Sequence, residues 1–124
     1  MKLTISQKSL DGSFQHVDNH ATITYLGDSI RLLYEEKQGA LVTLDISKQT
    51  VTLRRNDRWI TQGEFDLKEM TQLHIVNEHG TIIVTIQTVD LLVENGQFYM
   101  KYHLIQDDQI IDVHELQCTW DAEV

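Results

Sequence analysis

Two charged side chains stand where an alternating apolar strand would point into the protein interior. In the segment LLYEE, Glu36 continues an apolar series formed by Ile30, Leu32 and Tyr34. In the segment TVTLRR, Arg55 continues a second series formed by Val51 and Leu53. Residues two apart share one face of a strand, and an unpaired charge in an apolar interior is strongly unfavourable. We therefore predict that Glu36 and Arg55 form an ion pair inside the fold or at its rim, with the Tyr34 hydroxyl nearby.

This pair has two interpretations, a structural clasp or a polar contact for a ligand. Small barrels of about eight strands are either filled by side chains or hold one small ligand. Several large residues expected to face the interior are bulky enough to fill it: Tyr34, Leu44, Leu53, Phe98, Met100, Tyr102 and Leu104. The residue pattern leaves both interpretations open.

Other side chains capable of chemistry do not form a recognisable site. His16 and His20 are four residues apart in HVDNH, a spacing that suits zinc on a helix, but we expect a loop there and no third ligand is evident nearby. The sequence has no Gly-x-Ser-x-Gly elbow and no glycine-rich phosphate loop. His114 and Cys118 lie four residues apart on an expected strand, where the separation of about 13 Å prevents a hydrogen bond. We therefore expect no enzyme, no metal and no cofactor.

The elements that must position these residues are predicted to be strands. Apolar residues recur with a period of two in short segments along the whole chain, and no segment sustains a helical period. Polar turn signals containing Gly, Asn or Asp separate these segments, for example DGS at 11–13, NEHG at 77–80 and ENGQ at 94–97. The pattern predicts an all-β protein, an antiparallel up-and-down meander of eight to ten strands closed into a β-barrel. A two-sheet sandwich is the alternative.

The alternation changes phase at two places. The apolar set is even-numbered up to Ile86 and odd-numbered from Val89, which predicts a bulge or bend near residues 88–90. A second change falls between Val113 and Leu116. A barrel needs such corners where its strands coil sharply.

Composition limits the class of protein and its partners. A chain of 124 residues fits one domain, residues 1–124, with a core that needs no metal or disulfide. Nineteen acidic residues against ten Lys and Arg give a net charge of -9, which disfavours nucleic acid and anionic membranes as partners. The single cysteine, Cys118, suits a reducing compartment, and the N-terminal segment does not read as a secretory signal. We therefore expect a cytoplasmic protein.

Several segments resemble the YwiB-like family, small bacterial proteins whose domain has no assigned function. The resemblance covers nearly the whole chain and is carried by these motifs: LLYEE, VTLRRND, HIVNEHGTI, TIQTVDL and KYHLIQDDQ. The family is similar in architecture to the lipocalins and fatty-acid-binding proteins, so the resemblance implies a calycin-like barrel. Two turns depart from the family pattern, at 55–57 and 77–79, where Asn and Asp can still turn the chain.

Two functions from different classes follow from these observations. The first is a binding protein that holds a small apolar or amphipathic ligand inside the barrel, with Tyr34, Glu36, Arg55 and Tyr102 as the ligand-binding residues. The second is an interaction or structural protein with a filled barrel, working through its exterior or as a homodimer. A continuous cavity above about 300 Å³ favours the first.

Overall fold

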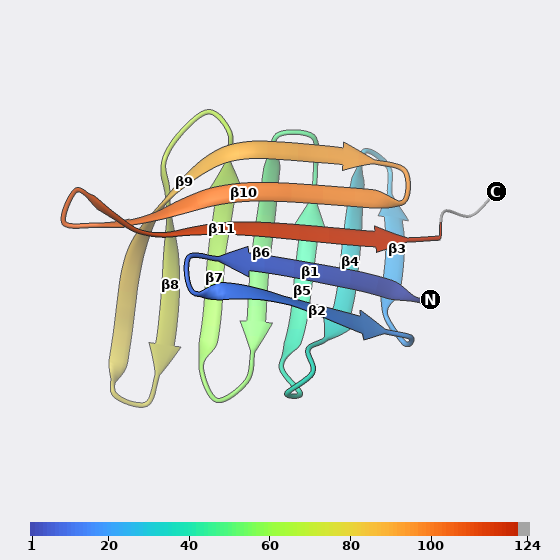
Figure 1. Cartoon of the computed structure of the whole chain (residues 1–124), viewed down its shortest axis with the longest axis horizontal. Coiled ribbons are helices and arrows are strands. Elements are labelled where there is room, and N and C mark those ends of the chain that lie inside the picture. Colours follow the sequence, from blue (N-terminus) through green and yellow to red (C-terminus); the bar gives the residue numbers. More distant parts are fainter. Residues whose placement is uncertain (122–124) are drawn as a thin grey trace.

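The computed structural model describes residues 1–121, which form eleven β-strands and no helix (Figure 1). The strands are β1 (Leu3–Ser9), β2 (Gly12–Asp18), β3 (Thr22–Leu26), β4 (Ser29–Glu35), β5 (Leu41–Ile46), β6 (Thr50–Asn56), β7 (Ile60–Asp66), β8 (Thr71–Asn77), β9 (Gly80–Glu94), β10 (Gln97–Gln106) and β11 (Gln109–Trp120). Within the described range, no helix is long and apolar enough to cross a membrane.

All eleven strands belong to one antiparallel sheet in the order β2-β1-β11-β10-β9-β8-β7-β6-β5-β4-β3. From β3 to β11 each strand pairs with the next one along the chain, as expected of a meander. The β1–β2 hairpin joins the other side of β11, so the short β2–β3 connection runs between the two edges of the sheet. The sequence-based prediction of an all-β antiparallel meander is confirmed.

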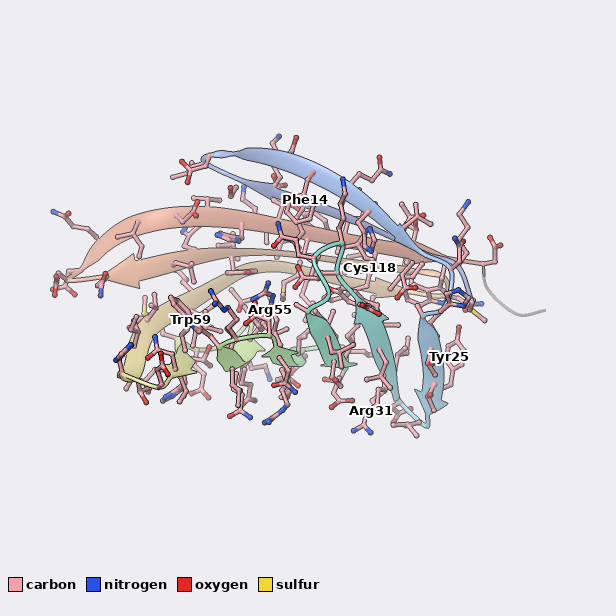
Figure 2. The ribbon with its side chains drawn as sticks, turned by 90° about the horizontal axis from the view of Figure 1, so that it is seen from below. Phe14, Tyr25, Arg31, Arg55, Trp59 and Cys118 are labelled. Atoms are coloured by element: carbon pink, nitrogen blue, oxygen red, sulfur yellow. The ribbon has the colours of Figure 1, made fainter. Side chains whose placement is uncertain are left out.

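The sheet curls over on itself into a half-barrel with two facing layers. In Figure 1, β3 to β8 run nearly vertically, whereas β1, β2, β10 and β11 cross them nearly horizontally. The 15-residue strand β9 bends from one layer into the other. Figure 2 shows the two layers from below, with side chains between them. Apolar residues from both layers form one core, whose fully buried members include Leu3, Leu32, Leu44, Phe65, Ile86 and Phe98.

The predicted bulge near residues 88–90 is confirmed in β9. Tyr102 of β10 is opposite Thr88 and Lys101 is opposite Asp90, so Val89 is an additional residue without a partner. The inward series therefore changes from even to odd numbers at this point. The bulge lies in the strand that passes from one layer to the other, where the sheet must bend most.

The second predicted phase change is in a different place. The register of β10 and β11 shifts where Leu104 is opposite Asp112 and Ile105 is opposite Ile110, which makes Ile111 the additional residue. From Asp112 onward the alternation is regular. The apparent change between Val113 and Leu116 arises because a polar residue, His114, occupies an inward position that the apolar pattern does not reveal.

The prediction of eight to ten strands was too low because two strands carry weak apolar alternation. The inward series of β2 is Phe14, His16 and Asp18, opposite Gln7, Ile5 and Leu3 of β1. That of β7 consists of Thr61, Gly63 and Phe65. The His16 segment, expected to be a loop, is therefore an edge strand.

The predicted closure by strand pairing is not confirmed, because the two edge strands β2 and β3 share no ladder in the described residues. Side chains of β2 instead hold the backbone of β4. Asp18 Oδ2 accepts a hydrogen bond from Glu35 N (2.9 Å), and His16 Nε2 lies 2.9 Å from Glu35 O. Glu35 lies two residues beyond Leu33, which pairs with Thr22 of β3. Backbone groups that a longer β3 would bond are thus satisfied by side chains, which we call the β2–β4 clamp.

Further contacts fasten the same side of the half-barrel. The terminal amino group of Met1 donates to Ala21 O (2.9 Å). Trp120 Nε1 donates to the Tyr25 hydroxyl (3.1 Å), which joins the end of β11 to β3. The two sheet edges are therefore held near each other without forming a strand pair.

Replacing Asp18 by Ala is expected to destabilise the fold by about 1–2 kcal/mol, because the backbone amides of Glu35 and His20 lose their acceptor. The clamp also predicts a pH dependence. Burial alone would raise the pKa of Asp18, but these backbone hydrogen bonds hold the pKa below its ordinary value. A depressed pKa in the folded state stabilises above the unfolded pKa, and this contribution is lost as the pH falls through the folded pKa.

Urea unfolding at neutral and acidic pH measures both effects, with Asp11→Ala as the control because the exposed Asp11 carboxylate has no hydrogen-bond partner in residues 1–121. Equal free energies of unfolding for the two variants would contradict the role of the clamp.

Candidate functional site

A cavity of about 660 Å³ lies between the two layers, opening beside β2 and the β4–β5 turn. Most of its deeper wall is apolar and comes from both layers: Ile5, Val42, Leu44, Leu53, Phe65, Leu73, Met100, Leu104 and Leu116. The rim includes Gln7, Phe14, Gln15, Lys37 and Gln38. All four residues predicted from the sequence, Tyr34, Glu36, Arg55 and Tyr102, line this one cavity. The interior is therefore hollow on the side where the predicted polar group lies.

A second hollow of about 680 Å³ lies on the outer face of β4 to β8 and is more open to solvent. Most of the residues around it have polar side chains, among them the exposed ion pair of Arg31 and Asp45. In Figure 2, Arg31 points away from the space between the layers, whereas Arg55 lies within it. The internal cavity is thus the better candidate site.

The predicted pair of Glu36 and Arg55 is confirmed. Arg55 Nε donates to Glu36 Oε1, and Arg55 Nη1 contacts Asp57 Oδ2 at 2.9 Å. Glu36 directly follows β4, where Gly39 (φ +97°) allows the tight turn and Glu36 N donates to Ala40 O at 2.8 Å. Arg55 comes from β6, opposite Val42 of β5. The Glu36 side chain is 17% exposed and the Arg55 side chain is 32% exposed, so both lie at the cavity wall near its mouth.

Electrostatics keep Arg55 charged. Burial alone would lower the pKa of the guanidinium, but the hydrogen bond and charge of Glu36, with the charge of Asp57, raise the pKa above its ordinary value. The pKa of Asp57 is lowered mainly by the Trp59 backbone N–H and also by Arg55. Arg55 and Asp57 are therefore both held in their charged forms.

The two predicted tyrosines face the cavity from opposite layers. Tyr34 of β4 is 5% exposed, and burial, reinforced by Cys118 and Glu36, raises the pKa of its hydroxyl well above the ordinary value. Burial and the nearby Asp112 raise the pKa of Tyr102. The Tyr102 ring contacts Phe65, with centroids 4.7 Å apart. Both hydroxyls therefore stay protonated at physiological pH.

Sequence reasoning missed a polar chain behind Tyr102. The Tyr102 hydroxyl lies 3.4 Å from His114 Nδ1, and His114 Nε2 lies 2.9 Å from Asp112 Oδ2. The rings of Tyr102 and His114 stack with centroids 5.2 Å apart. Asp112 Oδ1 also accepts from Leu10 N (3.1 Å) and Val113 N (2.8 Å), which fixes the carboxylate. The available signal was the period of two running back from Leu116 through His114 to Asp112.

The other candidates for chemistry do not gather into a site. His16 serves in the β2–β4 clamp, and residues 1–121 hold no group of three or more His, Cys, Asp or Glu placed to bind a metal ion. Cys118 is fully buried in the core, and burial raises the pKa of its thiol to about 12. A buried thiol that stays protonated is a poor nucleophile.

The state of Cys118 predicts its reactivity. At pH 8 the folded protein should react with a thiol reagent at least about a hundredfold more slowly than the urea-unfolded chain, because the thiolate is scarce and inaccessible. Mass spectrometry of iodoacetamide adducts over time measures both rates. Rapid labelling of the folded protein would contradict the buried position.

The cavity-wall pair predicts an intermediate coupling energy. A double-mutant cycle with Glu36→Gln and Arg55→Met should give about 1–2 kcal/mol, since the pair is neither fully buried nor fully solvated. The pair of Arg31 and Asp45, which is 47% and 39% exposed, is the matched control and should give a clearly smaller coupling, because solvent screens both charges. Chemical unfolding of the four proteins in each cycle supplies the values, and no coupling between Glu36 and Arg55 would refute the pair.

Comparisons with known proteins agree with this architecture. Residues 2–118 match the model of a family described as a domain of unknown function, DUF1934. A search of the curated proteins found no match. Among solved structures, the fold is similar to the crystal structure of the YwiB protein from Bacillus subtilis, with a TM-score of 0.69 and 14% identity over 99% of this chain and 92% of that one. The resemblance inferred from the sequence is confirmed, and the chain belongs to the DUF1934 family of YwiB-like proteins, a domain of unknown function.

Proposed function

We propose that this protein binds a small amphipathic molecule in the cavity between its two layers. The observation that carries the proposal is the cavity of about 660 Å³, bounded by apolar walls and by one polar group at Glu36 and Arg55. Ligand pockets usually have volumes of about 300–1,000 Å³, mostly apolar linings and a few convergent polar groups. The volume and lining match that description.

The position of the polar groups supports an amphipathic ligand. Glu36 and Arg55 lie near the mouth, whereas Leu44, Phe65 and Met100 form deeper wall. A molecule with a polar end toward the mouth and an apolar body inside would match both regions. Apolar burial contributes about 25 cal/mol per Å², so the body would supply most of the affinity.

We further propose that the fold works as a calycin-like barrel, which binds a ligand in its interior and does not catalyse a reaction. The β2–β4 clamp holds the edges of the half-barrel together, as closed pairing does in a complete barrel. A cytoplasmic setting is consistent with the lone, fully buried Cys118. The alternative function, an interaction protein with a filled barrel, is less well supported because the interior is hollow.

Native mass spectrometry and a probe titration test the proposal. Protein purified without denaturation should carry an additional small mass or bind one molecule of the uncharged fluorophore N-phenyl-1-naphthylamine per chain. Val42→Phe fills the cavity from β5 and should weaken probe binding by about tenfold or more. The same substitution should release any retained mass.

Leu41→Phe is the matched control, because Leu41 is the neighbouring residue on β5 but is 58% exposed. Leu104→Trp fills the cavity from the other layer and keeps the test valid if Val42→Phe unfolds, which circular dichroism would reveal. Binding that is unchanged in both cavity-filling variants, or absent from the unmodified protein, would overturn the proposal.

A further inference from the structure

The charges lining the cavity determine what kind of polar end it accepts. Arg55 lies between two carboxylates, Glu36 and Asp57, so this cluster has one net negative charge. The positive charge of Arg55 is already neutralised by these two carboxylates. An incoming anion would also be repelled by the Glu36 carboxylate next to Arg55. The cluster therefore repels a carboxylate or phosphate end group rather than attracting it.

Hydrogen bonds from Tyr102 through His114 to Asp112 make the Tyr102 hydroxyl oxygen a hydrogen-bond acceptor toward the cavity. Because the Asp112 carboxylate accepts from His114 Nε2, the other ring nitrogen, Nδ1, carries the lone pair in the neutral imidazole. Nδ1 then accepts a hydrogen bond from the Tyr102 hydroxyl, with 3.4 Å between the two atoms. The free capacity of the Tyr102 oxygen is its lone pairs, which require a donor on the ligand.

Aromatic rings around the cavity also favour a cation over an anion. Tyr34, Phe65 and Tyr102 line the cavity, and Phe14 stands at its rim. In Figure 2, Phe14 lies on the side of β2 that faces the other layer. The face of an aromatic ring attracts cations and repels anions, with about 0.5–2 kcal/mol for a well-placed ring.

The remaining ionisable groups around the cavity do not reverse this preference for a cation. Lys37 and Glu115 border the rim and contribute one charge of each sign. His114 is paired with Asp112, and His16 is engaged in the β2–β4 clamp. The chain as a whole has a net charge of -9, so its long-range field also draws cations toward the opening.

From these observations we propose that the ligand is an organic cation, an ammonium group attached to an apolar body, and not a carboxylate such as a fatty acid. This inference rests on the proposed function and names the ligand class of the same site. The ammonium group would lie near Glu36 and the oxygen of Tyr102, with the apolar body against Leu44 and Phe65.

Three molecules with the same tail separate the alternatives: decylammonium, whose N–H groups can donate to Tyr102, decanol and decanoate. Calorimetric titration of the native protein at pH 7, below the micellar concentrations, should rank their affinities in that order. The ammonium should bind at least about tenfold more tightly than decanoate, at one molecule per chain. Loss of binding in Val42→Phe excludes adsorption to the acidic exterior.

Variants test the role of individual groups. Glu36→Gln should reduce the preference for the ammonium over decanoate by about tenfold, since it removes the net negative charge of the cluster. Glu35→Gln is the matched control, because the neighbouring Glu35 side chain is exposed on the other face of β4 and should leave the preference unchanged. Tyr102→Phe should also weaken ammonium binding, whereas Tyr99→Phe removes a hydroxyl that does not line the cavity and should not.

The failures of the two proposals are distinguishable. If none of the three molecules binds, and the uncharged fluorophore also fails, the proposed function is wrong. If decanoate binds as tightly as the ammonium or more tightly, the charge inference is overturned and the binding function stands. An unchanged preference in both Glu36→Gln and Tyr102→Phe also overturns the charge inference.

Discussion

The structure depends on one strand that belongs to both layers. β9 is long enough to pair with β8 in one layer and with β10 in the other, and its bulge at Val89 resets which residues face inward. Without the reset, Leu91 and Val93 would point outward, because a change of one residue in register moves every side chain to the opposite face. With it, one sheet supplies both walls of a single interior.

An interior built this way must accommodate polar groups where the layers diverge. Every inward charge discussed above has a partner: Arg55 lies between Glu36 and Asp57, and Asp112 holds His114 and two backbone amides. Such pairing offsets the cost of partial burial and fixes each side chain before any ligand arrives. The polar groups of the cavity wall are therefore held in fixed positions by their partners.

The open edges follow from the same geometry. β3 has only five residues and begins at Thr22, opposite Leu33, so it does not reach Glu35. The side chains of Asp18 and His16 bond the exposed backbone of Glu35 in its place. Side-chain bonds satisfy the edge and block pairing with another chain at that point. They also place a hydrogen-bonded seam, in place of a continuous ladder, beside the mouth of the cavity.

The sequence by itself determined the strands with strong apolar alternation, the bulge in β9, the family, and the meeting of Glu36 with Arg55. These features depend on the period of two and on the cost of an unpaired charge, which are local or nearly local constraints. It could not reveal β2 and β7, whose inward residues are largely polar or small, nor the chain from Tyr102 through His114 to Asp112. Only the tertiary structure decided that the β1–β2 hairpin lies beside β11, that the edges are clamped, and that the interior stays hollow. Those outcomes depend on how distant segments pack, because a cavity is the volume that side chains from both layers leave unfilled, and no single strand encodes it.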